Sequence, residues 1–66
     1  MPTPEELNKL LSIVNEQWNR GIKHSIEWQQ AFDFYNANNE RQLRLGCFSC
    51  YIKVMIFIKQ SIALYA

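Results

Sequence analysis

Apolar residues return at helical spacing in three separate segments of this chain, and each segment opens with a helix-capping signal. In the first, Thr3-Pro4-Glu5-Glu6 combines a capping threonine, a proline suited to the first helical position and a glutamate three residues after the cap. Gly21 suits a left-handed helix end, so we predict a helix over residues 4–20. Its apolar stripe consists of Leu7, Leu10, Leu11, Val14 and Trp18.

Two further helices are predicted on the same grounds. Ser25 is placed to cap a second helix over residues 26–37, and a cluster of asparagines indicates the turn after it. Asn39 and Gln42 have the spacing of a third helix start, which predicts a helix over residues 40–64. A bend near Gly46 is expected in this helix, because glycine costs a helix interior about 1 kcal/mol relative to alanine. The sequence therefore predicts a single all-α domain over residues 1–66, a small three-helix bundle with the third helix longest.

Charge is divided unevenly along the chain. Residues 1–40 hold all six acidic side chains and three basic ones, a net charge of −3, whereas residues 41–66 hold four basic side chains and no acidic one. The total of +1 lacks the basic excess that is typical of nucleic-acid-binding domains. The two oppositely charged parts instead favour contacts between copies of the chain or with a protein partner.

Helix length predicts where such a contact forms. At about 1.5 Å per residue, a helix over residues 40–64 reaches about 37 Å, against about 25 Å and 18 Å for the first two. Its carboxyl-terminal half should then be partly uncovered, and a contiguous exposed apolar surface usually marks an interface. The candidate interaction residues are Ile56, Ile58, Lys59, Ile62, Leu64 and Tyr65.

The leading functional hypothesis is a non-enzymatic interaction or structural module. It would oligomerise or dock into a larger protein assembly, such as a viral or phage particle, through its basic, apolar carboxyl-terminal helix. The sequence contains no Ser/His/Asp set, phosphate-binding glycine loop or carboxylate pair, so we predict neither catalytic residues nor a cofactor. With no signal-peptide pattern and two cysteines, we expect an intracellular location, in the cytoplasm or within an assembly.

Cys47-x-x-Cys50 is the one motif in the chain with potential chemistry. In a redox motif the first cysteine lies at a helix start, where the helix dipole lowers its pKa, and a chain break at Gly46 would place Cys47 there. With His24, the pair supplies three of the four ligands of a usual structural zinc site. The favoured interpretation is simpler: both cysteines are small core residues that face the first two helices.

The last two predicted helices also allow a DNA-binding and a membrane-surface function. A helix-turn-helix protein would use the third helix, with Arg41, Gln42 and Arg44 in its first turns, to read DNA. A membrane-surface protein would lay the same helix on lipid, with Lys53 and Lys59 on its polar side. Neither nucleic acid nor membrane is the expected partner.

Overall fold

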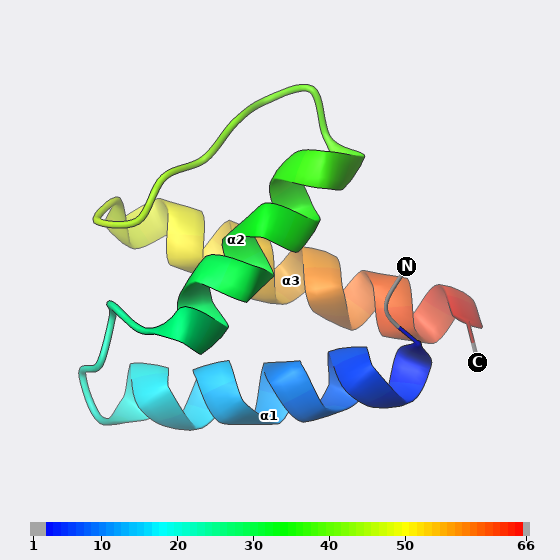
Figure 1. Ribbon diagram of the computed structural model, residues 1–66, viewed down its shortest axis with the longest axis horizontal. Coiled ribbons are helices and arrows are strands. Elements are labelled where there is room, and N and C mark those ends of the chain that lie inside the picture. The colour runs from blue at the N-terminus through cyan, green and yellow to red at the C-terminus, as the bar shows by residue number, and fades with distance from the viewer. Residues whose placement is uncertain (1–2, 66) are drawn as a thin grey trace.

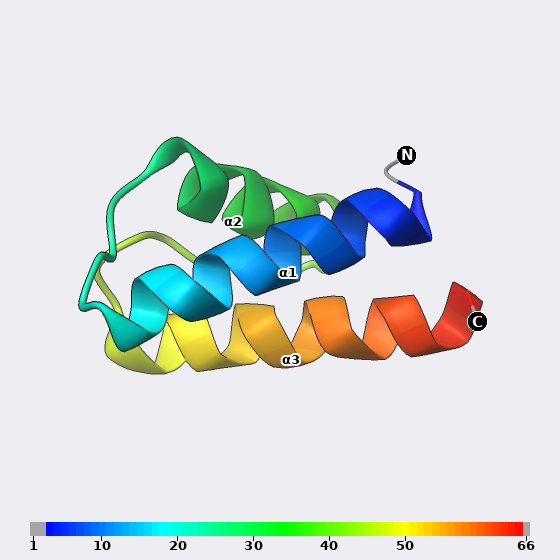
Figure 2. The same cartoon turned by 90° about the horizontal axis from the view of Figure 1, so that it is seen from below.

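The computed structural model describes residues 3–65, and the side chains of residues 3–64. It contains three helices, α1 (Pro4–Asn19), α2 (Ile26–Asn38) and α3 (Phe48–Tyr65). Figures 1 and 2 show α1 and α3 side by side in opposite directions, with α2 crossing obliquely and packing against both. Within the described residues there is no strand, so the predicted all-α three-helix bundle is confirmed.

The first two helices begin where the capping residues predict. The Glu6 N–H donates to the Thr3 Oγ1 at 3.1 Å, and the Thr3 N–H donates to the Glu6 carboxylate at 3.4 Å, which completes a capping box. The Ser25 hydroxyl accepts the Trp28 N–H at 3.1 Å. Gly21 has a φ of +78°, the left-handed conformation expected after α1. The ends of α1 and α2 each lie one residue from the prediction.

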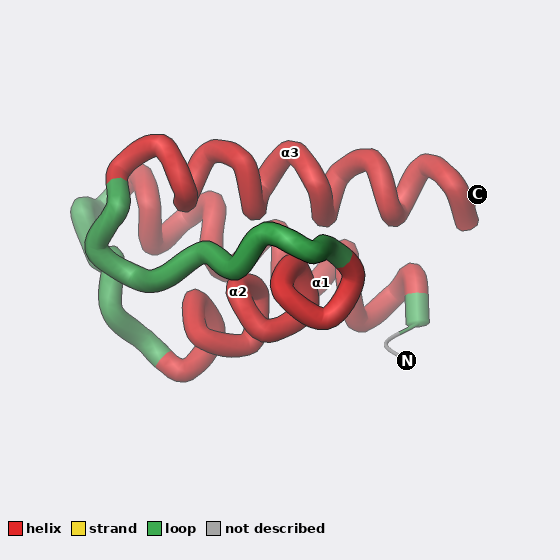
Figure 3. The backbone as a smooth tube through the Cα atoms, turned by 90° about the horizontal axis from the view of Figure 1, so that it is seen from above, coloured by secondary structure: helices red, strands yellow, loops and turns green. Residues whose placement is uncertain are grey.

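The start of α3 was predicted wrongly. The helix begins at Phe48 rather than at residue 40, and residues 39–47 follow an extended path from the end of α2 to the start of α3 (Figure 3). Gly46 has a φ of +103°, which side chains other than glycine rarely adopt. No helix runs through Gly46, so the expected bend within a longer helix is absent, and α3 begins two residues after this glycine.

The polar residues that resemble a helix start instead complete the end of α2. The side-chain amides of Asn38 and Asn39 donate to the carbonyls of Phe34 and Tyr35, each at 2.8 Å. The Gln42 amide donates to the Asn36 carbonyl at 3.1 Å. Because the last carbonyls of a helix lack partners within the helix, these amides satisfy α2 and none of them begins a new helix.

Asn36 also fixes the extended segment to α2. Its amide donates to the Leu43 carbonyl and its oxygen accepts the Leu43 N–H, both at 2.9 Å. This pair of hydrogen bonds holds Leu43 in place, and its side chain is buried in the core. Leu43 is thus the residue through which this otherwise largely exposed segment packs into the core.

Tyr51 lies at the centre of the core. Its ring contacts Trp28, Phe32 and Trp18, with centroids 4.7, 5.2 and 5.5 Å away. Its hydroxyl donates to the Lys23 carbonyl at 2.6 Å and accepts the Gly46 N–H at 3.0 Å. One buried side chain therefore joins α3 to both connecting segments. The buried core as a whole comprises Leu7, Val14, Trp28, Ala31, Phe32, Leu43, Cys50, Tyr51, Val54 and Ile58.

The predicted overhang of the third helix is absent. With 18 residues against 16, α3 and α1 measure about 27 Å and 24 Å, so their lengths nearly match. Figure 2 shows α1 running beside α3 over most of its length. Ile58, an expected interaction residue, is fully buried and belongs to the core.

Replacing Tyr51 with phenylalanine removes one hydroxyl and leaves the Lys23 carbonyl and the Gly46 N–H without that partner. We expect a loss of about 1–3 kcal/mol in the free energy of unfolding, measured by urea denaturation. Tyr35→Phe is the matched control, because the side-chain hydrogen bond that involves Tyr35 within the described residues uses its carbonyl and not its hydroxyl. Equal effects of the two substitutions would contradict the anchoring role of Tyr51.

The same substitution at two isoleucines of α3 compares a buried position with an exposed one. Ile58→Val should lower the free energy of unfolding by about 0.5–1.5 kcal/mol, since it deletes a methyl group from a fully buried site. Ile56, which is 50% exposed, should tolerate the same substitution within about 0.5 kcal/mol. Urea denaturation followed by circular dichroism measures both, and the reverse order would place Ile58 on the surface.

Candidate functional site

The first turn of α3 carries the two cysteines in different environments. Cys47 directly precedes the helix and is exposed, whereas Cys50 lies within the first turn and is buried. The Cys50 N–H donates to the Cys47 carbonyl at 3.0 Å. The expectation that both are core residues is therefore correct for Cys50 and wrong for Cys47. The break at Gly46 leaves Cys47 outside the helix, at its positive end.

Neighbouring polar groups shift the pKa values of the two thiols in opposite directions. A hydrogen bond with the Cys50 side chain, followed by one with the Ser49 side chain, lowers the pKa of Cys47 to about 7. The Cys47 sulfur lies 3.5 Å from the Ser49 hydroxyl. The same interaction with Cys47, followed by burial, raises the pKa of Cys50. At neutral pH this turn therefore holds an exposed thiol that ionises readily next to a buried thiol that does not.

The position of this turn is fixed from both sides. The Gly46 N–H donates to the buried Tyr51 hydroxyl, which holds the backbone just before Cys47. Phe48, just after it, lies against Trp18 with ring centroids 5.1 Å apart. The Lys23 amine lies 5.5 Å from the centroid of each of these two rings. Packing of the surrounding residues therefore holds the cysteine turn in one place.

The structure does not bring the three candidate metal ligands together. His24 lies exposed in the segment between α1 and α2. Across residues 3–65 no group of three histidine, cysteine or acidic residues is arranged to hold a metal ion. Cys47, Cys50 and His24 thus do not form the three-ligand set that the zinc hypothesis requires.

A second feature is a line of exposed apolar side chains on α3, here called the α3 stripe. Phe48, Ile52 and Ile56 follow one another at intervals of four residues and are 62%, 39% and 50% exposed. Residues four apart lie on one face of a helix, so the three side chains form a continuous surface. This stripe, rather than an overhanging helix end, is the exposed apolar surface of α3.

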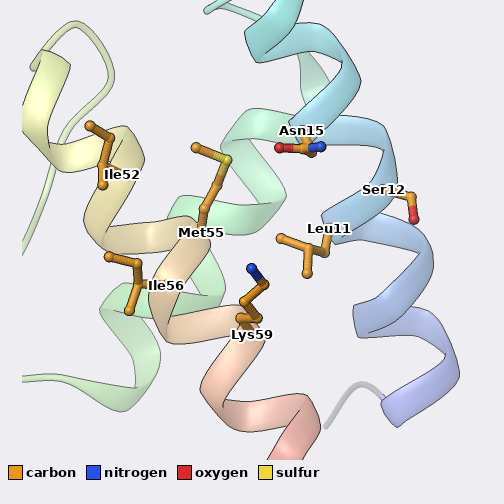
Figure 4. A pocket seen from close by; sticks show the side chains of 7 residues that line it. All are labelled: Leu11, Ser12, Asn15, Ile52, Met55, Ile56 and Lys59. Carbon is orange, nitrogen blue, oxygen red and sulfur yellow. The ribbon is translucent and has the colours of Figure 1, made fainter.

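The α3 stripe borders a groove between α1 and α3, here called the α1–α3 groove. Its volume is about 370 Å³. Figure 4 shows Leu11 extending from α1 towards α3, and Lys59 extending from α3 into the space between the two helices. Lys59 is the one charged side chain in the lining, which comprises Leu11, Ser12, Asn15, Ile52, Met55, Ile56 and Lys59.

The predicted interaction residues therefore separate into groups. Ile56 and Lys59 line the groove, whereas Ile58 is buried and Ile62 is partly buried against the core. Leu64 is 86% exposed but lies outside the groove lining. The side chain of Tyr65 lies outside the described residues. Sequence reasoning missed Phe48, Ile52 and Leu11, although the four-residue spacing of the stripe becomes visible once α3 begins at Phe48.

The path of the chain between α2 and α3 does not have the form that the DNA-binding hypothesis assumes. A helix-turn-helix joins its helices by a short turn, whereas residues 39–47 separate α2 from α3, and Arg41 and Arg44 lie in that segment rather than on a recognition helix. None of the helices in the described part of the chain combines the length and the apolar character that crossing a membrane requires.

The chain was compared with known protein families, curated proteins and solved structures. No protein-family model, curated protein or solved structure matches the chain.

The lowered pKa of Cys47 can be measured directly. Alkylation by iodoacetamide requires the thiolate, so its rate at Cys47 should rise with pH and reach half its maximum at about pH 7. Cys50→Ala removes the interaction that contributes most and should move this midpoint upward, towards the value of about 8.5 for an ordinary cysteine.

Fragmentation of the peptide over residues 45–53 by mass spectrometry locates the label, because the two cysteines are separated by two residues. A midpoint near 8.5 in both proteins would contradict the effect of Cys50 on Cys47.

Proposed function

We propose that this chain is a small non-enzymatic helical module that associates with a second copy of itself through the α3 stripe and the α1–α3 groove. The observation that carries the proposal is the exposure of Phe48, Ile52 and Ile56 in a line beside a groove that is itself largely apolar. Burial of apolar surface contributes about 25 cal/mol per Å², so contact between two such faces favours association.

The shape of the groove supports a helix as the contacting element. α1 and α3 run in opposite directions, and a groove between two helices accepts the apolar face of a third. In a two-fold dimer the same face serves both copies, so the α3 stripe of one copy would enter the groove of the other. The two α1–α3 layers would then form a four-helix arrangement.

Charge supports contact between copies. The described part of α3 carries Lys53 and Lys59 and no acidic residue, whereas α1 carries Glu5, Glu6 and Glu16 against one basic residue, Lys9. A two-fold axis parallel to the helices would place α3 of one copy, the basic helix, over α1 of the other, the acidic helix. Such complementarity favours a particular orientation and faster encounter. Docking into a larger assembly, such as a viral or phage particle, would bury the same surface.

The test is the concentration dependence of molecular mass, measured by light scattering and analytical ultracentrifugation from micromolar concentration upward. The wild-type chain should form dimers, and Ile52→Glu combined with Ile56→Glu should weaken them more than about tenfold, since burying a charge without a partner is costly. Ile26→Glu is the control, because Ile26 is 73% exposed at the start of α2 and lies outside the groove.

Three outcomes would contradict the proposal. The first is a wild-type chain that stays monomeric throughout this concentration range. The second is a dimer that is equally stable with glutamate at positions 52 and 56 while circular dichroism shows unchanged helicity. The third is a monomer that binds vesicles of anionic phospholipid through the same residues, which would favour the membrane-surface hypothesis.

A further inference from the structure

We propose that Cys47 and Cys50 form a dithiol–disulfide couple that reacts with low-molecular-weight disulfides, with Cys47 as the attacking thiol and Cys50 as the resolving thiol. This chemistry is separate from the proposed self-association, because neither cysteine lines the α1–α3 groove. The two cysteines lie three residues apart in a turn whose position is fixed, and they differ in exposure.

The backbone brings the two residues within the range of a disulfide. The Cys50 N–H donates to the Cys47 carbonyl at 3.0 Å, a hydrogen bond between residues three apart. Such a tight turn places the two Cα atoms less than about 7 Å apart. A disulfide needs about 4.4–6.8 Å between Cα atoms, so rotation of the side chains can close the bond without unfolding α3.

Exposure assigns the order of reaction. The Cys47 side chain is exposed at the end of the helix, whereas Cys50 is 8% exposed beneath the first turn. A dissolved disulfide can reach the first sulfur but not the second. Attack therefore starts at Cys47, and Cys50 reacts only with a sulfur already bound to this turn.

The electrostatic environment favours the same order. The backbone N–H groups of Cys50 and Ser49, at the start of α3, also favour a negative charge on Cys47. Interactions with Cys50 and Ser49 lower its pKa to about 7, which provides thiolate at neutral pH. The raised pKa of Cys50 keeps this thiol protonated until the mixed disulfide forms. In the mixed disulfide Cys47 carries no negative charge, so it no longer opposes ionisation of the Cys50 thiol.

The reaction balances as two exchanges. The Cys47 thiolate attacks one sulfur of oxidised glutathione, forms a mixed disulfide and releases one glutathione thiolate. Cys50 then loses its proton to solvent and attacks the Cys47 sulfur, which forms the Cys47–Cys50 disulfide and releases a second glutathione thiolate. The protein loses two electrons and two protons, and oxidised glutathione gains the two electrons. Excess dithiol reverses both steps.

The experiment treats the reduced full-length chain with oxidised glutathione at neutral pH, quenches it with acid and measures intact mass. The wild-type chain should lose two hydrogen atoms and carry no glutathione, with a Cys47 adduct appearing first. Cys50→Ser should stop at one glutathione on Cys47. Cys47→Ser should react at least about tenfold more slowly, since its remaining thiol is buried.

Denatured protein provides the control for folding. In concentrated urea the two single-cysteine variants should react at similar rates, because the difference in exposure exists only in the folded chain. Ile52→Glu combined with Ile56→Glu should leave the disulfide chemistry of the folded chain unchanged, which distinguishes failure of this proposal from failure of self-association.

The proposal would be overturned by any of three results. The wild-type chain could retain glutathione on one or both cysteines without closing the internal disulfide. The two single-cysteine variants could react equally fast while folded. Alternatively, oxidation could yield disulfide-linked dimers in place of the internal bond.

Discussion

The buried side chain of Tyr51 joins both connecting segments to the aromatic core. It bonds to Lys23 in the first connecting segment and to Gly46 in the second, while its ring packs against Trp28 in α2. Each hydrogen bond contributes about 0.5–1.5 kcal/mol net, and aromatic pairs contribute a similar amount beyond area burial. For a chain of this size, with a total stability on the order of 3–10 kcal/mol, one side chain supports a large share of the fold.

The sequence predicts the local elements that depend on neighbouring residues. Thr3 with Glu6, Ser25 and Gly21 act within four residues of their own positions, so α1 and α2 follow from caps and periodicity. Asn39 and Gln42 show where this reasoning fails. Amide side chains cap either end of a helix, and only the three-dimensional path shows that these two serve the end of α2. That single misassignment lengthened the third helix and created an overhang that the fold does not have.

The candidate site was predictable in its residues but only partly in its geometry. The Cys47-x-x-Cys50 spacing and the role of a break at Gly46 are visible in the sequence. The exposure of Cys47 depends on where α3 begins, and this depends on Asn36 holding Leu43 across seven residues and on Tyr51 holding Gly46. Likewise, Ile58 is buried and Ile56 is exposed although only two positions separate them on α3. This difference depends on how α1 packs against α3.

In the segment between α2 and α3, Asn36 holds Leu43 and Tyr51 holds Gly46, while Glu40 and Arg41 face solvent. The number of residues between these two fastenings is therefore fixed by the distance they span, and removing one would pull either Leu43 or the cysteine turn out of place. Glu40 and Arg41 lie outside this span, exposed between Asn39 and Gln42, whose side chains bond to α2. Additional residues there would enlarge a surface loop at little entropic cost, which makes it the natural position for an inserted epitope or tag.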